Sequence, residues 1–315
     1  MENKFAVTCQ SISKRYIKNT PFEKVNVKAL EDINFDVRTG ELYGIIGPDG
    51  AGKTTLFRIL ATLILPDSGT VIIEGKDLIK DFKIIRQEIG YMPERFSLYQ
   101  DLTVEENLNV FAKLFKTTIE ENYYLIENIY MQIEPFKNRR AGKLSGGMKQ
   151  KLALCCALIH KPKVLLLDEP TRGVDPVSRK EFWDILKKLK EQNITIILST
   201  SYMDEAKLCE RIALIQNGSF LKIDSPENII NQFKHKLWSV SSDDMSKLLN
   251  DLRKISYIRT CFPFGDSHHI TLKNYRRNLN ELKAELEKNG HTSVEIKKIK
   301  ASIEDCFMDL VLNIK

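Results

Sequence analysis

A glycine-rich stretch at residues 47–55 constrains the fold of this chain more than any other part of it. It reads Gly-Pro-Asp-Gly-Ala-Gly-Lys-Thr-Thr and fits the pattern G-x-x-x-x-G-K-[ST], in which backbone N–H groups and a helix N-terminus surround a phosphate. The mostly apolar residues 41–46 predict a buried strand before it, and apolar residues at helical spacing follow from Lys53 to Leu63. A strand, a glycine turn and a helix are the context this pattern requires. The alternative, a glycine-rich turn without a ligand, is disfavoured by that context.

Side chains in and after this stretch carry the chemistry of a nucleoside triphosphate. Lys53 is expected to reach the β- and γ-phosphates, and the Thr54 hydroxyl to hold Mg²⁺. The apolar run 164–168 ends in Asp168 and Glu169, which would complete the Mg²⁺ shell through water and polarise the attacking water as general base, respectively. The nucleotide contacts predicted from the stretch itself are Gly47, Pro48, Asp49, Gly50, Ala51, Gly52, Lys53, Thr54 and Thr55.

Composition excludes several other classes of protein. The 315 residues carry a net charge of +6 without a block of like charge, so nucleic-acid binding has no support. The six cysteines contain no C-x-x-C pair, which favours buried thiols in a reducing compartment. The N-terminus Met1-Glu2-Asn3 shows no signal peptide, and no apolar run is long enough to span a bilayer. We therefore expect a soluble protein whose membrane role, if any, depends on a partner.

The order of strands and helices indicates two domains. Residues 5–12 predict a strand and residues 17–28, with Pro21, a loop. Strands and helices alternate up to about residue 233, which predicts a mainly parallel sheet, except that residues 94–160 look entirely helical. Residues 234–315 have fewer motifs and predict a small α+β domain. The predicted division is therefore 1–233 and 234–315.

The stretch Leu144-Ser145-Gly146-Gly147 opens a further helix, and its free amides could form a second anion site. A plain helix N-cap at Ser145 is the alternative. With this stretch the chain resembles the ATP-binding subunits of ABC transporters, over about residues 5–232. The resemblance implies a P-loop NTPase fold with a RecA-like core sheet, an antiparallel β subdomain and a helical subdomain. It also implies a head-to-tail dimer, in which Ser145, Gly146 and Gly147 cap the γ-phosphate held by the opposite subunit.

Other roles follow from the same resemblance. Tyr16 matches the aromatic residue that stacks on adenine, and Asp175 matches the carboxylate of the loop that contacts the other subunit. Residues 95–108 occupy the region that receives a coupling helix of a membrane-spanning permease subunit. The ending 301–307 is similar to the tail of the drug-exporter branch, ABC type-2, which also carries a small C-terminal domain. The implied location is the cytoplasmic face of the cell membrane.

The chain departs from the family pattern at two positions. Glu94 stands where the family has a glutamine that touches Mg²⁺; a carboxylate keeps the oxygen ligand but adds negative charge. Ser201 stands where the family has a histidine, and it cannot become cationic. Loss of one such contact could reduce the rate about a hundredfold. Because Glu169 is retained, we expect a slow but competent ATPase, in a homodimer or with a non-identical ATP-binding subunit.

Two other functions fit the sequence less well. A regulatory subunit that binds ATP with little or no hydrolysis is motivated by Glu94 and Ser201 and opposed by Glu169. A relative acting on ribosomes or DNA would usually carry two ATP modules or long coiled coils, and this chain has one phosphate loop and no sustained heptads. The sequence therefore favours an ATPase that drives transport, with export implied by the resemblance, and it does not reveal the cargo.

Overall fold

The computed structural model describes residues 4–19, 24–95, 97–273 and 279–312, and the chain forms two compact units, Met1–Pro226 and Glu227–Lys315. Predictions for Met1, Glu2, Asn3 and Phe96 lie outside the described residues. The expected boundary at 233/234 falls a few residues inside the second unit. The cause is helix α7 (Pro226–Asn231), whose Ile229 carbonyl accepts a 3.7 Å contact from Cys306 Sγ in the C-terminal helix α10 (Ile303–Leu312).

A six-stranded sheet forms the centre of the first unit, in the order β10-β9-β3-β8-β7-β6. Neighbours from β9 to β6 pair in parallel, and β10 pairs antiparallel with β9. Strands β3, β7 and β8 are buried at every residue, as expected for a sheet covered on both faces. The bounds are β3 (Leu42–Ile46), β6 (Ile89–Met92), β7 (Val164–Asp168), β8 (Thr195–Thr200), β9 (Arg211–Gln216) and β10 (Ser219–Asp224).

An antiparallel sheet forms the second layer, in the order β2-β1-β4-β5. Its strands are β1 (Phe5–Asn19), β2 (Lys24–Arg38), β4 (Ser68–Ile73) and β5 (Lys76–Asp77). The predicted loop over 17–28 was wrong at both ends, because β1 and β2 pair as far as Asn19 and Lys24. The β-branched residues Ile17, Val25 and Val27 favour this extended backbone. Residues 20–23 between them lie outside the described residues.

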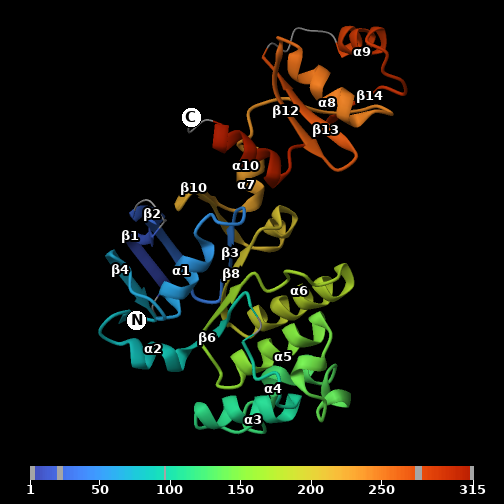
Figure 1. Cartoon of the computed structure of the whole chain (residues 1–315). Coiled ribbons are helices and arrows are strands. Elements are labelled where there is room, and N and C mark those ends of the chain that lie inside the picture. The colour runs from blue at the N-terminus through green and yellow to red at the C-terminus, as the bar shows by residue number, and fades with distance from the viewer. Residues whose placement is uncertain (1–3, 20–23, 96, 274–278, 313–315) are drawn as a thin grey trace. The chain divides into compact units, whose positions relative to one another are not determined.

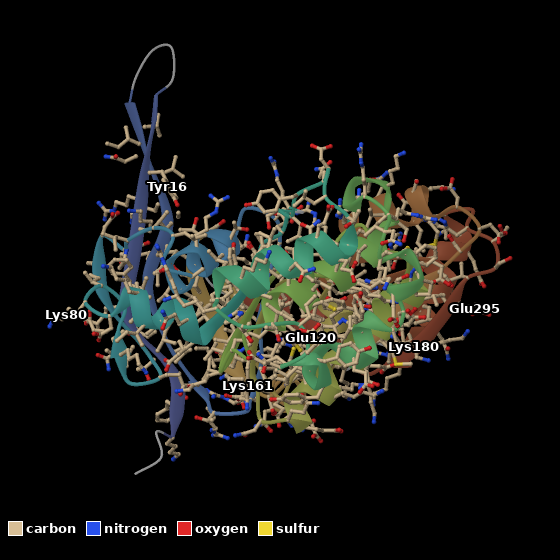
Figure 2. The ribbon with its side chains drawn as sticks, turned by 90° about the horizontal axis from the view of Figure 1, so that it is seen from below. Tyr16, Lys80, Glu120, Lys161, Lys180 and Glu295 are labelled. Atoms are coloured by element: carbon tan, nitrogen blue, oxygen red, sulfur yellow. The ribbon has the colours of Figure 1, made fainter. Side chains whose placement is uncertain are left out.

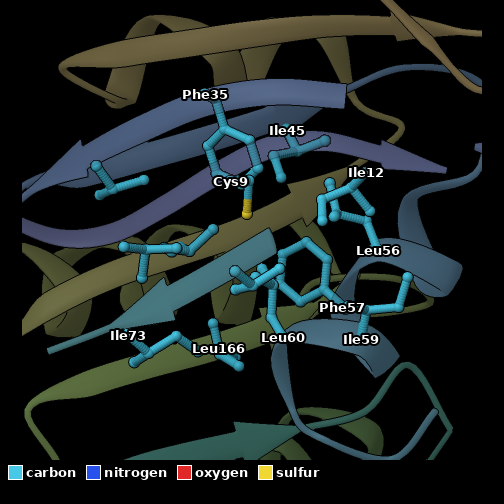
Figure 3. Close-up of a cluster of buried hydrophobic side chains, with 14 of the residues drawn as sticks. Cys9, Ile12, Phe35, Ile45, Leu56, Phe57, Ile59, Leu60, Ile73 and Leu166 are labelled. Atoms are coloured by element: carbon cyan, nitrogen blue, oxygen red, sulfur yellow. The ribbon is translucent and has the colours of Figure 1, made fainter. Parts of the chain in front are cut away.

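Helix α1 (Lys53–Leu60) joins the two sheets through one hydrophobic core (Figure 3). Leu56, Phe57, Ile59 and Leu60 are fully buried on the helix. They pack with residues from both sheets, including Cys9, Ile12, Phe35, Ile45, Ile73 and Leu166. Because Lys53 is the first residue of this helix, the core fixes the direction in which the helix N-terminus points.

The described residues between β6 and β7 form helices joined by turns, where the sequence predicts a helical segment at 94–160, and α3 and α4 both pack on α5 (Figure 1). Helix α3 begins with a capping box, in which Thr103 Oγ1 accepts from Glu106 N–H at 3.2 Å and Glu106 accepts from Thr103 N–H at 2.7 Å. Besides α1, the described helices of the first unit are α2 (Phe82–Glu88), α3 (Val104–Leu114), α4 (Tyr123–Tyr130), α5 (Gly146–Leu158) and α6 (Pro176–Glu191), with 3₁₀ turns η1 (Glu134–Phe136), η2 (Ala141–Lys143) and η3 (Met203–Leu208).

Between α7 and α10, the second unit has the chain order β-α-β-β-α-β and the antiparallel sheet order β12-β13-β11-β14, which is a ferredoxin-like arrangement. Its elements are β11 (Leu237–Ser241), α8 (Met245–Lys254), β12 (Ile258–Phe264), β13 (Ser267–Leu272), α9 (Leu279–Lys288) and β14 (Glu295–Ile299). Sequence reasoning missed β12, which contains Pro263. Proline is tolerated there because β12 is an edge strand.

All six cysteines are free and buried. Burial raises the pKa of Cys261 to about 11 and the pKa of Cys306 to about 12. It also raises the pKa of Cys9, Cys155, Cys156 and Cys209. Throughout the described part of the chain, no helix has the length and apolar character needed to cross a membrane.

Candidate nucleotide-binding site

The glycine-rich stretch forms a tight turn between β3 and α1, and two of its glycines cannot be replaced without displacement. A Cβ atom on Gly47 would lie 2.2 Å from the carbonyl oxygen of Ile215, and Gly47 N–H donates to Thr200 O at 3.2 Å. Gly52 has a φ of +108°, and a Cβ there would lie 2.4 Å from Ala29 O. The backbone of the turn is thus packed against neighbouring backbone, which fixes its path.

A pocket of about 350 Å³ lies over this turn. The predicted residues around it are Tyr16, Asp49, Gly50, Gly52, Lys53, Thr54, Thr55, Glu94 and Glu169. Tyr16 is on the long β1–β2 hairpin, 39% exposed, with Lys14 Nζ 6.0 Å from its ring centroid (Figure 2). The predicted Ala51 is buried, and its carbonyl accepts from Gly218 N–H at 2.9 Å, so it supports the turn.

Lys53 and Glu169 form a buried ion pair at the floor of the pocket. Lys53 Nζ lies 3.0 Å from Glu169 Oε1, and the two side chains are 5% and 3% exposed. Lys53 also donates to the carbonyl oxygens of Gly47 (2.6 Å) and Pro48 (2.9 Å). Glu169 has a φ of +49°, a strained conformation for a residue with a Cβ. Such strain is frequent at functional sites, and here it places the carboxylate beside the lysine.

Asp168 lies beside this pair with one oxygen unused. Its Oδ1 accepts a 2.6 Å hydrogen bond from Ser199 Oγ, and its buried Oδ2 has no hydrogen-bond partner among the described residues. Burial raises the pKa of Asp168, although the hydrogen bond from Ser199 lowers it in part. A buried carboxylate oxygen without a hydrogen-bond partner is well placed to be a ligand of a cation.

Hard cations could bind to the oxygen atoms of Thr54, Asp168 and Glu94. Within the described ranges, no group of three or more His, Cys, Asp or Glu side chains forms a metal site. A cation at this position would therefore need further oxygen ligands from water or phosphate, as is usual for Mg²⁺.

Ser201 contacts the proposed general base directly. Its backbone N–H donates to Glu169 Oε2 at 3.1 Å, and its Oγ lies at 3.4 Å from the same oxygen. Residue 201 therefore holds Glu169 mainly through its backbone N–H, and the serine hydroxyl adds the longer contact.

Three residues around the site were missed in the sequence. Ser199 holds Asp168 and also accepts from Glu169 N–H at 2.9 Å. Glu205, 3% exposed, accepts from Thr171 Oγ1 at 2.8 Å and from Thr200 Oγ1 at 2.6 Å, which links the segments after β7 and β8. Neither residue belongs to a sequence pattern that we recognise.

Arg172 is the third missed residue, and it lines the nucleotide pocket. Its Nη1 donates to Glu94 Oε1 at 2.6 Å, and its Nη2 donates to Asp49 Oδ2 at 2.8 Å. The signal that could have found it is the unexpected negative charge at Glu94, which calls for a cation nearby.

The remaining predicted residues form a second cluster, around the N-termini of α5 and α6. Ser145 Oγ accepts from Met148 N–H at 3.3 Å and caps α5, and Asp175 Oδ1 accepts from Val177 N–H (3.1 Å) and Ser178 N–H (3.0 Å) and caps α6. A Cβ on Gly146 would lie 3.6 Å from Gly173 O, and one on Gly147 would lie 2.8 Å from Ser178 Oγ. This second cluster is separate from the pocket lining.

Together, the parallel sheet, the glycine turn and the Lys53–Glu169 pair define a phosphate-loop nucleotide-binding protein. Residues 30–172 match the sequence profile of the family described as ABC transporter. The Nod factor export ATP-binding protein I of Burkholderia pseudomallei (strain K96243) is 33% identical over 288 residues, 89% of this chain and 91% of that protein. The chain therefore belongs to the ATP-binding proteins of the ABC transporter family, and the resemblance inferred from the sequence is confirmed.

Two further comparisons define the extent of the similarity. The probable multidrug ABC transporter ATP-binding protein YbhF of Escherichia coli (strain K12) is 37% identical over 313 residues, which are 98% of this chain and 52% of YbhF. The chain thus spans about half the length of that relative. A solved structure of the ATP-binding cassette MJ0796, a dimer in a post-hydrolysis state with ADP and Pi, superposes with a TM-score of 0.62 at 28% identity, over 70% of this chain and 98% of the cassette.

Proposed function

We propose that this chain hydrolyses ATP and that hydrolysis drives export through a separate membrane-spanning subunit. The observation that carries the proposal is the position of Glu169 at the floor of the pocket, beside Lys53 and the glycine turn. The relatives named for multidrug transport and Nod factor export support the export direction. The cargo would be selected by the membrane subunit.

In the proposed reaction, Lys53 binds the β- and γ-phosphates and Glu169 accepts a proton from the attacking water. The water oxygen bonds to the γ-phosphorus, the bond from that phosphorus to the bridging oxygen breaks, and ADP and inorganic phosphate leave. Ser201 N–H holds the Glu169 carboxylate in position. Mg²⁺, when bound, supplies charge neutralisation at the phosphates, and Thr54, Asp168 and Glu94 are the residues that would hold it.

Two further contacts complete the proposed site, one to the adenine ring and one to the nucleotide of a second subunit. Tyr16 is exposed on the β1–β2 hairpin and lines the pocket, so its ring is available to stack on adenine. Ser145, Gly146, Gly147 and Asp175 would contact the nucleotide of a second ATP-binding subunit, identical or not. Their separation from this chain's own pocket supports a shared site, and the dimeric state of the MJ0796 cassette agrees with it.

An apolar groove supports docking of a permease on the cytoplasmic face of the membrane. It lies between α2 and the helices that connect β6 to β7, and it is lined by residues such as Leu63, Phe111, Leu114 and Phe115. The part of residues 95–108 that the structure describes leads into α3, which supplies one wall of this groove. A short amphipathic helix of a partner would bury its apolar face there.

A second function is a regulatory subunit with slow or no hydrolysis, in a heterodimer. Ser201 favours it, because the side chain at this position cannot supply a positive charge to the developing phosphate. No observation favours action on ribosomes or DNA.

The test is steady-state ATPase activity of the purified chain, with and without its membrane partner. The Glu169→Gln variant should lose hydrolysis by at least about a hundredfold and keep nucleotide binding. The matched control is Glu210→Gln, because Glu210 forms an exposed ion pair with Lys190 at 2.7 Å, away from the pocket. A wild-type chain that binds ATP and leaves it intact in both conditions would favour the regulatory function instead.

A further inference from the structure

The nucleotide pocket is lined by as many carboxylates as cations. The carboxylates are Asp49, Glu94 and Glu169, and the cations are Lys28, Lys53 and Arg172. Among the pocket cations, Lys53 is paired with Glu169 and Lys28 with Glu31. A nucleoside triphosphate is itself strongly anionic, so each additional carboxylate near its phosphates weakens binding by electrostatic repulsion. Glu94 is the carboxylate that the family pattern does not contain.

One arginine joins two of these carboxylates from separate parts of the chain. Asp49 belongs to the turn between β3 and α1, Glu94 follows β6, and Arg172 follows β7. The guanidinium donates one N–H to each acid, at 2.8 Å and 2.6 Å. A guanidinium is cationic at every physiological pH, so Arg172 always brings a positive charge to the two acids. We call these three residues the Arg172 clasp.

The clasp is too exposed to matter much for folding. The Arg172 and Asp49 side chains are 43% and 61% exposed, and exposed ion pairs contribute little to stability. Its charge nevertheless lies at the mouth of the pocket, where a polyphosphate must enter. An effect on ligand affinity without an effect on stability is therefore expected.

We propose that Arg172 is a positioning residue that makes Glu94 compatible with nucleotide binding, by neutralising Glu94 and holding it against Asp49 at the mouth of the pocket. The inference rests on the proposed function in one respect, that the ligand is Mg²⁺–ATP. It assigns to Arg172 an action through Glu94, and no contact of its own with the phosphates.

The experiment is a double-mutant cycle on the full-length chain, with the dissociation constant of a non-hydrolysable ATP analogue in the presence of Mg²⁺ as readout. Arg172→Ala should weaken binding about tenfold, within the range measured for coupled neighbouring charges. Glu94→Gln alone keeps a side-chain oxygen for Mg²⁺ and removes the negative charge, so it should bind more tightly than wild type. The double variant should bind within about threefold of Glu94→Gln, because the charge that Arg172 neutralises is gone.

Two controls separate this effect from general ones. Arg253→Ala removes the same charge from an exposed position on α8, in the second unit, and should leave the dissociation constant unchanged. Arg172→Lys keeps the charge without the two-pronged geometry, so it should fall between wild type and Arg172→Ala. Thermal unfolding of the Arg172 variants should remain within about 2 °C of wild type.

Several results would overturn the inference. Wild-type affinity in Arg172→Ala would show that the clasp has no role in binding. If Arg172→Ala weakened binding by the same factor in the wild-type and the Glu94→Gln backgrounds, Arg172 would act on the nucleotide itself. A wild-type chain that binds nucleotide without hydrolysing it would refute the proposed ATPase function. The ratios of dissociation constants between the variants would still decide the role of Arg172. A wild-type chain that binds no nucleotide would refute both.

Discussion

Lys53 Nζ and Glu169 Oε1 lie 3.0 Å apart in a buried ion pair, so the cation that should bind phosphate and the carboxylate that should activate water neutralise each other in this structure. The γ-phosphate of an incoming nucleotide would compete with Glu169 for Lys53. Its arrival would therefore release Glu169 at the moment when a base is needed. The two residues are coupled, and changing one should alter the behaviour of the other.

The first prediction concerns Glu169→Gln and ligand stabilisation. Without the carboxylate, Lys53 is left as an unpaired buried charge, which should lower the free energy of unfolding by about 1–3 kcal/mol, because the carbonyl bonds to Lys53 remain. Phosphate then supplies the missing negative charge. A non-hydrolysable ATP analogue should raise the melting temperature of this variant by more than that of wild type. Differential scanning fluorimetry measures both shifts, and an equal or smaller shift in the variant would contradict the coupling.

The second prediction concerns Ser199, which holds Asp168 at 2.6 Å and Glu169 N–H at 2.9 Å. Ser199→Ala removes both bonds inside the protein and should cost about 1–3 kcal/mol in the free energy of unfolding. The bond from Ser199 lowers the pKa of Asp168, so its loss should raise that pKa further. If the site requires ionised Asp168, the acid limb of the ATPase pH profile should move to higher pH.

Ser219→Ala is the control for Ser199→Ala, because the Ser219 hydroxyl makes a long, exposed contact of 3.5 Å to Glu31 O. It should change neither stability nor the pH profile. An unshifted acid limb in a folded Ser199→Ala protein would mean that Asp168 ionisation does not limit the rate.

The third prediction concerns the position where the family has histidine. Ser201→Ala should change kcat by less than about threefold, because the shorter contact to Glu169 comes from the backbone N–H, which alanine keeps. Ser201→His should raise kcat, by up to about a hundredfold if the imidazole reaches the phosphate. Single-turnover hydrolysis distinguishes a faster chemical step from faster product release. No gain with histidine would show that Ser201 does not set the rate.

The fourth prediction concerns the second unit, where Asp305 accepts from His269 Nδ1 at 2.8 Å and from Ser302 Oγ at 2.6 Å. Burial raises the pKa of Asp305, but the bonds from His269 and Ser302 outweigh it, and the net pKa lies below its ordinary value. The stabilisation by Asp305 is thus present above its unfolded pKa and is lost as the pH falls through the folded pKa. Asp305→Asn should destabilise the unit by about 1–3 kcal/mol near pH 6, with a smaller difference near pH 3.

Urea unfolding followed by Trp238 fluorescence measures this difference, in a Trp183→Phe background that leaves Trp238 as the single tryptophan of the chain. Asp266→Asn, at an exposed position between β12 and β13, is the control and should show no such pH dependence. A constant Asp305→Asn difference from pH 6 to pH 3 would contradict the assigned network.

The sequence predicted those parts of the site that are local in the chain. Gly47 to Thr55 act as one turn, and Asp168 and Glu169 end one strand, so a short pattern describes each of them. Arg172 could not be found in this way, because its partners Glu94 and Asp49 are 78 and 123 positions away. Only the folding of β3, β6 and β7 into one sheet brings these three residues together.

The fold shows the same limit. The parallel sheet followed from the alternation of apolar strands and helices, which is a local signal. The β1–β2 hairpin was shortened in the prediction because Pro21 suggested a loop, whereas pairing between the two strands decides the backbone there. Strand β12 was not predicted. It contains Pro263, which is unfavourable inside a strand, and its place at the edge of the sheet makes the proline acceptable.

The six buried thiols can be used to measure local opening of the chain by cysteine labelling. A cysteine reacts with an alkylating reagent only when it is deprotonated and exposed to solvent. In the closed state, burial removes the exposure and the raised pKa keeps the thiol protonated. Each labelling rate therefore reports how often one region opens. Cys9, Cys155, Cys156 and Cys209 report on the nucleotide-binding unit, and Cys261 and Cys306 on the ferredoxin-like unit. Mass spectrometry of a single labelling time course can thus measure how nucleotide changes the rate of local opening in each unit, without substituting any residue.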